Sequence, residues 1–172
     1  EAFLLHLRQE RSASPHTLRN YALDIRAFLD FLEEGGPKDL GSVTVVDFRT
    51  YLSRLHGKLA KGSIARRLAA LRSFFRFLYR KGLIPRDDST LVPTPKAEKK
   101  LPVSLSVAEV ESLLAVSAGT PRESSRNRAI LELLYSTGLR VSELVSLDLG
   151  SLGESWRKGG SFRVVGKGRK ER

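Results

Sequence analysis

The sequence predicts a mainly α-helical protein in which an N-terminal four-helix bundle is followed by the start of an α+β domain with a small β-hairpin. Apolar residues recur at steps of three and four through most of residues 1–84, as on the buried faces of amphipathic helices. Four of the seven prolines then fall between positions 85 and 102, where neither helical nor strand periodicity is present. After residue 160 the pattern changes to residues that favour strands. We therefore expect a helical domain over 1–84, a proline-rich linker over 85–100 and a second domain, incomplete, over 101–172.

The first two helices of the bundle have clear boundaries in the sequence. Residues 3–7 form a short amphipathic segment. Ser14 is a good N-cap for the next helix, because its side chain can accept a hydrogen bond from a free backbone N–H of the first turn. Pro15 then stands at the first helical position, where its missing N–H costs nothing. The apolar pattern continues to the Gly-Gly-Pro sequence at 35–37, which should end the helix.

Two further helices complete the predicted bundle. Thr44 and Asp47 have the spacing of a capping box and precede an apolar pattern that runs to residue 55. A fourth helix is expected over residues 63–81, with its end at Gly82. Four short amphipathic helices in one compact segment can bury a single shared core.

The C-terminal part begins with helical patterns and ends with a strand pattern. Ser106 and Glu109 form a second capping box, and the apolar residues that follow predict a short helix. A helix that contains residues 129–134 should end at Gly138 in a left-handed cap. Residues 161–165 favour a strand that leads into a glycine turn, and the second strand of this hairpin is too short to be stable alone.

The composition favours a polyanionic partner. The chain has 30 Lys and Arg residues against 19 Asp and Glu, a net charge of +11, and such an excess attracts nucleic acid. The absence of cysteine excludes a disulfide framework, a thiolate zinc site and a cysteine nucleophile. Three scattered histidines do not indicate a metal site. No run of about eighteen apolar residues and no secretory signal is found, so we expect no membrane partner and a cytoplasmic location.

The helix expected over residues 63–81 is the strongest candidate for a nucleic-acid interface. Residues 61–81 contain no acid, and their arginines form a ridge of side chains spaced one turn apart, away from the apolar stripe. Like charges at that spacing repel each other, and a polyanion would relieve the repulsion. The major groove of duplex DNA admits a helix, although a solvated basic face is the alternative interpretation. The ridge residues are Arg72, Arg76 and Arg80, and the further basic candidates are Arg66, Arg67 and Lys81.

Two further positions are candidates for phosphate chemistry. Arg140 follows Gly138 at the start of a short helix expected over 141–147, and Glu143 can pair with it or cap the backbone. Guanidinium donors beside helix N–H groups favour an anion, and a plain surface ion pair is the alternative. Lys167 lies between glycines that allow a ligand to approach closely, and the alternative is a lysine at a solvated hairpin tip. The chain contains no P-loop and no Gly-x-Gly-x-x-Gly motif, so no nucleotide cofactor is expected.

Four segments, in order along the chain, carry a more specific pattern. They read Ser-Pro-His-Thr-Leu-Arg-Asn-Tyr at 14–21, Leu-Pro-Val-Ser-Leu-Ser-Val-Ala-Glu-Val at 101–110, Thr-Gly-Leu-Arg-Val-Ser-Glu-Leu at 137–144 and Val-Gly-Lys-Gly-Arg-Lys-Glu-Arg at 165–172. Together they resemble the tyrosine recombinases of the phage integrase family. The first resembles the start of the SAM-like core-binding domain, the second the entry to the catalytic domain, and the last two its catalytic motifs. The likeness covers nearly the whole chain and is greatest to the bacterial Xer branch.

The resemblance implies site-specific recombination, in which duplex DNA is broken and rejoined through a 3′-phosphotyrosine without a metal or other cofactor. It implies that Arg140 clamps the scissile phosphate, that Glu143 is an accessory carboxylate, and that Lys167 is the general acid to the leaving 5′-oxygen. Thr17 and Arg19 join the basic helix as implied DNA contacts. The implied partners are duplex DNA and a tetramer of one or two recombinases on two DNA sites. The implied role is chromosome dimer resolution, linked to chromosome partition and cell division, or the integration of a mobile element.

Other catalytic groups of the family are not found in this chain. They are a later His-x-x-Arg motif, a further His or Trp, and a tyrosine nucleophile. All three histidines lie before residue 57, and the four tyrosines lie within helical patterns. We therefore expect the chain to bind DNA without recombining it, as part of a longer enzyme. A non-catalytic basic DNA-binding or regulatory protein and a basic RNA-binding module are the alternatives.

Overall fold

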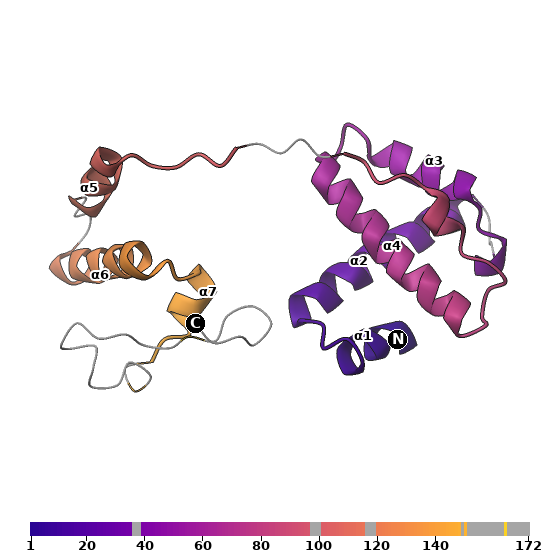
Figure 1. Ribbon diagram of the computed structural model, residues 1–172, viewed down its shortest axis with the longest axis horizontal. Coiled ribbons are helices and arrows are strands. Elements are labelled where there is room, and N and C mark those ends of the chain that lie inside the picture. The colour runs from indigo at the N-terminus through magenta and orange to yellow at the C-terminus, as the bar shows by residue number, and fades with distance from the viewer. Residues whose placement is uncertain (36–38, 97–100, 116–119, 149, 151–163, 165–172) are drawn as a thin grey trace. The chain divides into compact units, whose positions relative to one another are not determined.

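The computed structural model describes residues 1–35, 39–96, 101–115, 120–148, 150 and 164 (Figure 1). The chain divides into two compact units, Glu1–Lys100 and Leu101–Arg172. The first unit contains α1 (Ala2–Gln9), α2 (Pro15–Glu34), η1 (Leu40–Ser42), α3 (Val45–Leu55), α4 (Lys61–Arg80) and η2 (Asp88–Leu91). The second contains α5 (Val107–Ala115), α6 (Pro121–Thr137) and α7 (Val141–Val145). The mainly helical prediction is confirmed, and the expected hairpin after residue 160 lies outside the described residues.

The caps predicted for α2 and α3 are present. The Ser14 side chain accepts a hydrogen bond from the backbone N–H of Thr17 at 3.2 Å, and Pro15 occupies the first turn of α2. At the start of α3, the backbone N–H of Thr44 donates to Oδ2 of Asp47 at 2.8 Å. These local bonds satisfy backbone groups that a helix end leaves free, and they fix where each helix begins.

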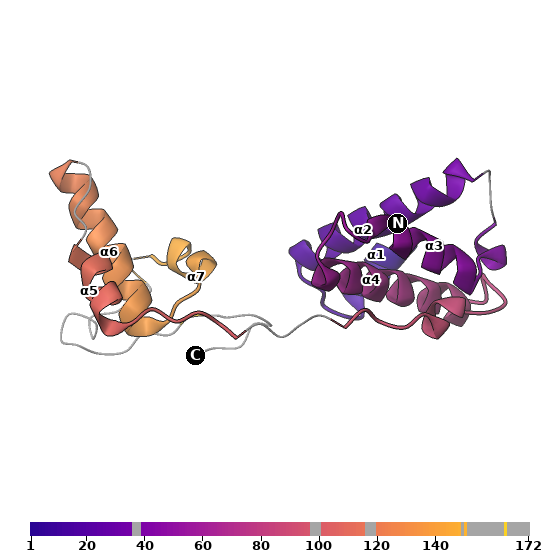
Figure 2. The same cartoon turned by 90° about the horizontal axis from the view of Figure 1, so that it is seen from above.

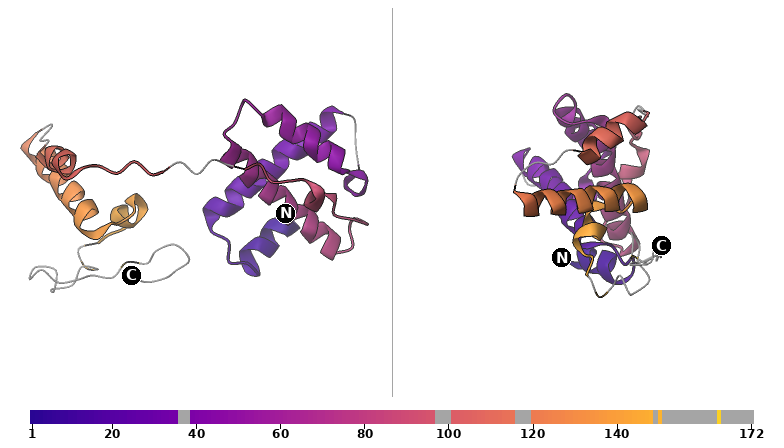
Figure 3. Two further views of the ribbon diagram at one scale, coloured as in Figure 1. Left: turned by 45° about the horizontal axis from the view of Figure 1, so that its top comes forward. Right: turned by 90° about the vertical axis from the view of Figure 1, so that its left-hand side faces the viewer.

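The crossing of α4 over α2 organises the first unit. Figure 1 and the left panel of Figure 3 show the two long helices crossing, and Figure 2 shows them from above, one behind the other in the view of Figure 1. α1 packs on α2, and α3 packs on both long helices. α4 begins at Lys61, two residues before the predicted start, and ends at Arg80, close to the left-handed Gly82 at φ 68°.

The core at this crossing is aromatic. Phe28 of α2 is fully buried and stacks on Phe48 of α3, with ring centroids 5.0 Å apart and planes 3° from parallel. Phe75 of α4 meets Phe48 edge-on, at 4.9 Å and 78°. Aromatic pairs in these arrangements add to the free energy that burial alone provides. One ring from each of α2, α3 and α4 therefore joins the three helices.

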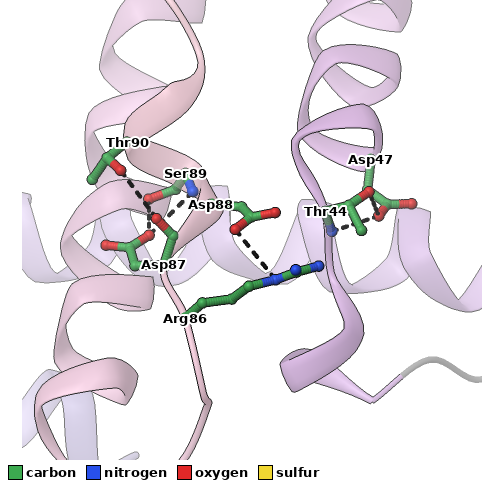
Figure 4. A network of polar contacts seen from close by, with 7 residues as sticks. All are labelled: Thr44, Asp47, Arg86, Asp87, Asp88, Ser89 and Thr90. Atoms are coloured by element: carbon green, nitrogen blue, oxygen red, sulfur yellow. Dashed lines mark hydrogen bonds and ion pairs between the residues drawn. The ribbon is translucent and has the colours of Figure 1, made fainter.

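The first part of the segment expected as a linker, residues 85–94, packs on the first unit, and together with Ile84 it forms residues 84–94, which we call the strap. Within the strap, η2 packs against α3 and α4. Ser89 is fully buried and Val92 is 3% exposed. Figure 4 shows how Asp87 organises this turn: its carboxylate accepts from the backbone N–H of Ser89 at 3.1 Å, and its carbonyl accepts from the Thr90 hydroxyl at 3.0 Å. The first unit thus extends past the predicted domain boundary at residue 84.

The second unit consists, in its described part, of three capped helices. The Ser106 N–H donates to Glu109 Oε2 at 2.7 Å, as the predicted capping box requires, and this bond lowers the pKa of Glu109. A capping box of Thr120 and Glu123 starts α6 at Pro121, and Gly138 ends α6 in the predicted left-handed conformation at φ 62°. None of the described helices in either unit combines the length and apolar character needed to cross a bilayer.

Truncation of Phe28 tests the aromatic core. We expect Phe28→Ala to lower the free energy of unfolding by about 3–5 kcal/mol, because the rings of three helices lose their common contact. Urea denaturation followed by circular dichroism measures the change. Leu23→Ala is the control: this side chain is on the same helix but 60% exposed, and its loss should change stability by less than about 0.5 kcal/mol. Equal effects of the two substitutions would contradict this account of the core.

Candidate nucleic-acid interface

The first two arginines of α4 neutralise a buried carboxylate. Asp24 of α2 has a side chain only 4% exposed. Arg66 pairs with its Oδ2 through Nη1, and Nε of Arg67 lies 3.5 Å from its Oδ1. No acidic residue stands near these arginines in the sequence, because the compensating carboxylate lies 42 residues before Arg66. Both guanidinium groups therefore have some of their N–H donors directed at a carboxylate inside the protein.

Arg67 extends this network to α3. Its Nη1 donates to the hydroxyl oxygen of Tyr51 at 3.2 Å. Burial raises the pKa of Tyr51, and the hydrogen bond from Arg67 opposes that rise only in part. The phenol is therefore a neutral structural group between two helices, in agreement with its assignment from the sequence to a helical pattern.

Arg72, the first residue of the predicted ridge, also forms hydrogen bonds within the protein. Its guanidinium donates to two backbone carbonyls and one hydroxyl of the strap, at Ser89, Val92 and Thr94. The ridge is therefore divided, because Arg76 and Arg80 are exposed while Arg72 is only partly so.

The end of α4 forms one wall of a cationic cavity of about 490 Å³ between α1, α2 and α4. Arg76, Arg80 and Lys81 line it, together with Arg11, which follows α1. Glu10 is the one acidic residue of this lining. Positive side chains around a concave surface of this size present several donors to the oxygens of a phosphate chain.

The carboxylate of Glu10 partly balances the positive charge of this cavity, and it contacts His6. Oε1 of Glu10 lies 3.0 Å from Nδ1 of His6. That contact lowers the pKa of Glu10, and the charges of Lys81 and Arg11 lower it further. His6, Glu10 and Arg11 were not predicted from the sequence, since helical periodicity does not show which residues in and after α1 face the end of α4.

The candidates on α2 lie near its N-terminus. The Thr17 hydroxyl is 2.9 Å from that of Ser14, so it takes part in the cap. Thr17 lies one helical turn before Tyr21, which lines the cationic cavity. Arg19 is exposed on the same helix. A DNA contact by either residue stays a prediction.

In the second unit, Glu143 holds Arg140. The Arg140 Nη1 lies 2.8 Å from Oε1 of Glu143, and the Arg140 backbone N–H donates to Oε2 at 2.8 Å. The Glu143 side chain is 7% exposed, whereas that of Arg140 is 57% exposed. Glu143 therefore both pairs with Arg140 and caps the backbone, as the sequence predicted. The guanidinium stays accessible and has further N–H donors.

The remaining site predictions concern Lys167 and metals. Lys167 lies outside the described residues, so its distance from Arg140 stays a prediction. Across the described part of the chain, no group of three or more His, Cys, Asp or Glu side chains is arranged to hold a metal ion.

Comparison with known proteins links both units to one family. Residues 1–82 match the phage integrase N-terminal SAM-like domain, and residues 104–172 match the phage integrase family domain. Tyrosine recombinase XerC of Pelobacter propionicus is 43% identical over 99% of this chain. XerC of Myxococcus xanthus is 44% identical over the whole chain, and XerD of Rhizobium meliloti is 40% identical. The chain spans 56–57% of the length of these relatives.

Solved structures share the fold. A lambda integrase dimer bound to a COC′ core site matches 99% of this chain and 60% of its own chain, with a TM-score of 0.74 at 19% identity. XerH bound to a palindromic difH substrate matches 94% of this chain and 49% of its own, with a TM-score of 0.69 at 20% identity. The resemblance deduced from four short motifs is thus confirmed over both units, and the chain belongs to the phage integrase family of tyrosine recombinases, with similarity to its Xer branch.

Proposed function

We propose that the full-length protein containing this chain is a site-specific recombinase, which breaks and rejoins duplex DNA through a 3′-phosphotyrosine. Residues 1–172 would supply DNA binding and part of the catalytic site. The accessible guanidinium of Arg140, held by the buried Glu143, is the observation that carries this proposal. Family membership supports it, since the relatives are named tyrosine recombinases.

The chemistry at Arg140 follows from the geometry of its side chain. When a tyrosine oxygen attacks the phosphorus, negative charge grows on the non-bridging oxygens. A guanidinium can donate two parallel N–H bonds to such oxygens, and these bonds are worth more as the charge increases. Glu143 keeps the fork in one orientation before the DNA arrives. As the bond from phosphorus to the 5′-oxygen breaks, that oxygen takes a proton, which we assign to Lys167.

Duplex DNA is the ligand that we propose for the first unit. Arg76, Arg80 and Lys81 line the cationic cavity, and together with Arg11 they outnumber its single acidic residue. The backbone of duplex DNA offers closely spaced phosphates to such a surface. The lambda integrase and XerH structures contain DNA, which supports this choice.

The assembly and the biological role are also proposals. A lambda integrase forms a tetramer on a Holliday junction, which supports a tetramer of this protein, or of this protein and a second recombinase, on two DNA sites. We propose chromosome dimer resolution in the cytoplasm, rather than integration of a mobile element, as the role, and the similarity to XerC and XerD supports this choice.

Neutralisation of the cavity tests the DNA interface. We expect Arg76→Gln, Arg80→Gln and Lys81→Gln each to make the negative slope of log affinity against log salt shallower by about 0.9, because each removes one phosphate contact. Fluorescence anisotropy with labelled duplex DNA, titrated with salt, measures the slope.

Arg26→Gln is the control for that series, because Arg26 is 79% exposed elsewhere on α2 and pairs with Asp30. Its salt slope should match that of the parent. An unchanged slope in all three cavity variants would place the DNA elsewhere, and tighter binding of RNA than of duplex DNA would favour an RNA-binding module.

Substitution of Asp24 separates structural arginines from DNA contacts. Asp24→Asn leaves Arg66 and Arg67 without their buried counter-charge, and we expect the free energy of unfolding to fall by about 1–3 kcal/mol. DNA affinity of the folded variant should not fall, since a negative charge is lost. Asp30→Asn, at an exposed ion pair, should change stability by less than about 0.5 kcal/mol. Weaker DNA binding without a loss of stability would contradict the structural role.

Truncation of Arg140 tests the catalytic assignment in the full-length protein. We expect Arg140→Ala to reduce strand cleavage at least about a hundredfold, as for other lost transition-state donors, while DNA affinity changes little. Trapping of the covalent complex on a nicked substrate measures cleavage. Arg128→Ala is a matched control, because Arg128 forms an exposed ion pair with Glu132 on α6. Equal losses of cleavage and affinity would make Arg140 a binding residue only and favour a non-catalytic DNA-binding protein.

A further inference from the structure

We propose that Arg72 is a positioning residue that fixes the point at which the chain leaves the first unit, by binding the strap to α4. This role differs from the DNA contact expected for the arginine ridge, and it does not depend on the proposed recombination.

The contacts of Arg72 are spread along the strap. Its Nε donates to the carbonyl of Ser89 at 3.2 Å, and its Nη1 donates to Oγ1 of Thr94 at 2.7 Å. Its Nη2 donates to the carbonyl of Val92. A planar guanidinium can reach several acceptors at fixed angles, whereas a lysine ammonium offers donors at one point only. One side chain thus binds the strap at three positions.

Other contacts also hold the strap against the first unit. Ile84 is 5% exposed and Val92 is 3% exposed, so apolar burial holds the strap at both ends. A Cβ atom at Gly41 would lie 3.2 Å from Cδ of Pro85, which shows how closely η1 approaches the start of the strap. Figure 4 shows η2 beside the start of α3, where Arg86 also pairs with Asp88 at 3.3 Å. The hydrogen bonds of Arg72 join α4 to the carboxyl-terminal half of the strap.

Arg76, one turn further along α4, provides a comparison within the same helix. Its side chain is exposed and lines the cationic cavity. Arg72 also borders that cavity, but its donors point to the strap. The two residues have the same charge on neighbouring turns and different partners, so exchange of each for lysine separates the geometry of the fork from the charge.

If Arg72 has the proposed role, it limits the length of free chain between the two units. Release of the strap would add about eleven residues to the segment that joins the two units, or roughly 40 Å when fully extended. A longer connection lowers the effective concentration of one unit at a site engaged by the other. Arg72 would therefore shorten the connection without any contact with DNA.

Hydrogen exchange of the 172-residue chain tests this role without DNA. In Arg72→Lys we expect the backbone amides of residues 84–94 to exchange at least about tenfold faster, because the strap opens more often, while the α2 and α4 core keeps its protection. Arg76→Lys should leave exchange in the strap unchanged. Unchanged exchange in Arg72→Lys would overturn the proposal, and so would equal acceleration throughout the first unit, which would show general destabilisation.

A salt titration with duplex DNA distinguishes the two roles further. Arg72→Gln should keep the salt slope of the parent, whereas a slope less negative by about 0.9 would make Arg72 a phosphate contact and overturn the proposed role. If the parent chain itself failed to bind DNA, the proposed function would be contradicted, and the exchange experiment would still decide the role of Arg72.

Discussion

The crossing of α2 and α4 is the contact on which the first unit depends. It buries Phe28 against rings from α3 and α4, and it brings Asp24 to the arginines at the start of α4. Burial of a carboxylate is unfavourable unless a cation and hydrogen bonds compensate for its lost hydration. The apolar and ionic contacts therefore require the same helix register, since a rotation of α4 that moved its apolar stripe would also separate the arginines from Asp24.

In this register, the basic residues of α4 have different partners at different points along the helix. Arg66 and Arg67 pair with a buried carboxylate. Arg72 donates hydrogen bonds to backbone carbonyls, whereas Arg76 and Arg80 line an open cavity. An arginine-rich helix in a protein of net charge +11 is thus not a uniform DNA-binding surface. Its internal acceptors lie toward the start and middle, and the surface left for an external polyanion is at its carboxyl-terminal end, where the helix dipole also favours cations.

Local signals located the helix ends that carry a capping motif, because each such motif involves residues close in sequence, whereas α4, which has no side-chain cap, begins two residues before its predicted start. Ser14, Thr44 with Asp47, and Gly138 act in the structure as their spacing predicts. Contacts between distant segments could not be predicted in this way. The partner of Arg66 lies on another helix, and the prolines around η2 suggested an open linker because nothing in their spacing shows that Ser89 and Val92 become buried. Arg140 and Glu143 were identified because their contact is local, while Arg11 joined the cavity only through tertiary packing.

If the proposed function holds, the contact between Arg140 and Glu143 would lower the entropy cost of binding a scissile phosphate. A free arginine side chain samples many rotamers, and immobilising it costs up to about 2 kcal/mol. The carboxylate of Glu143 already restricts that sampling in the DNA-free protein, so most of this loss occurs during folding. The guanidinium is also shared with an anion before any phosphate arrives, which weakens its attraction for an ordinary phosphodiester relative to a more highly charged species. In the proposed recombinase, discrimination between resting and reacting DNA would thus begin with an ion pair that forms before any DNA is bound.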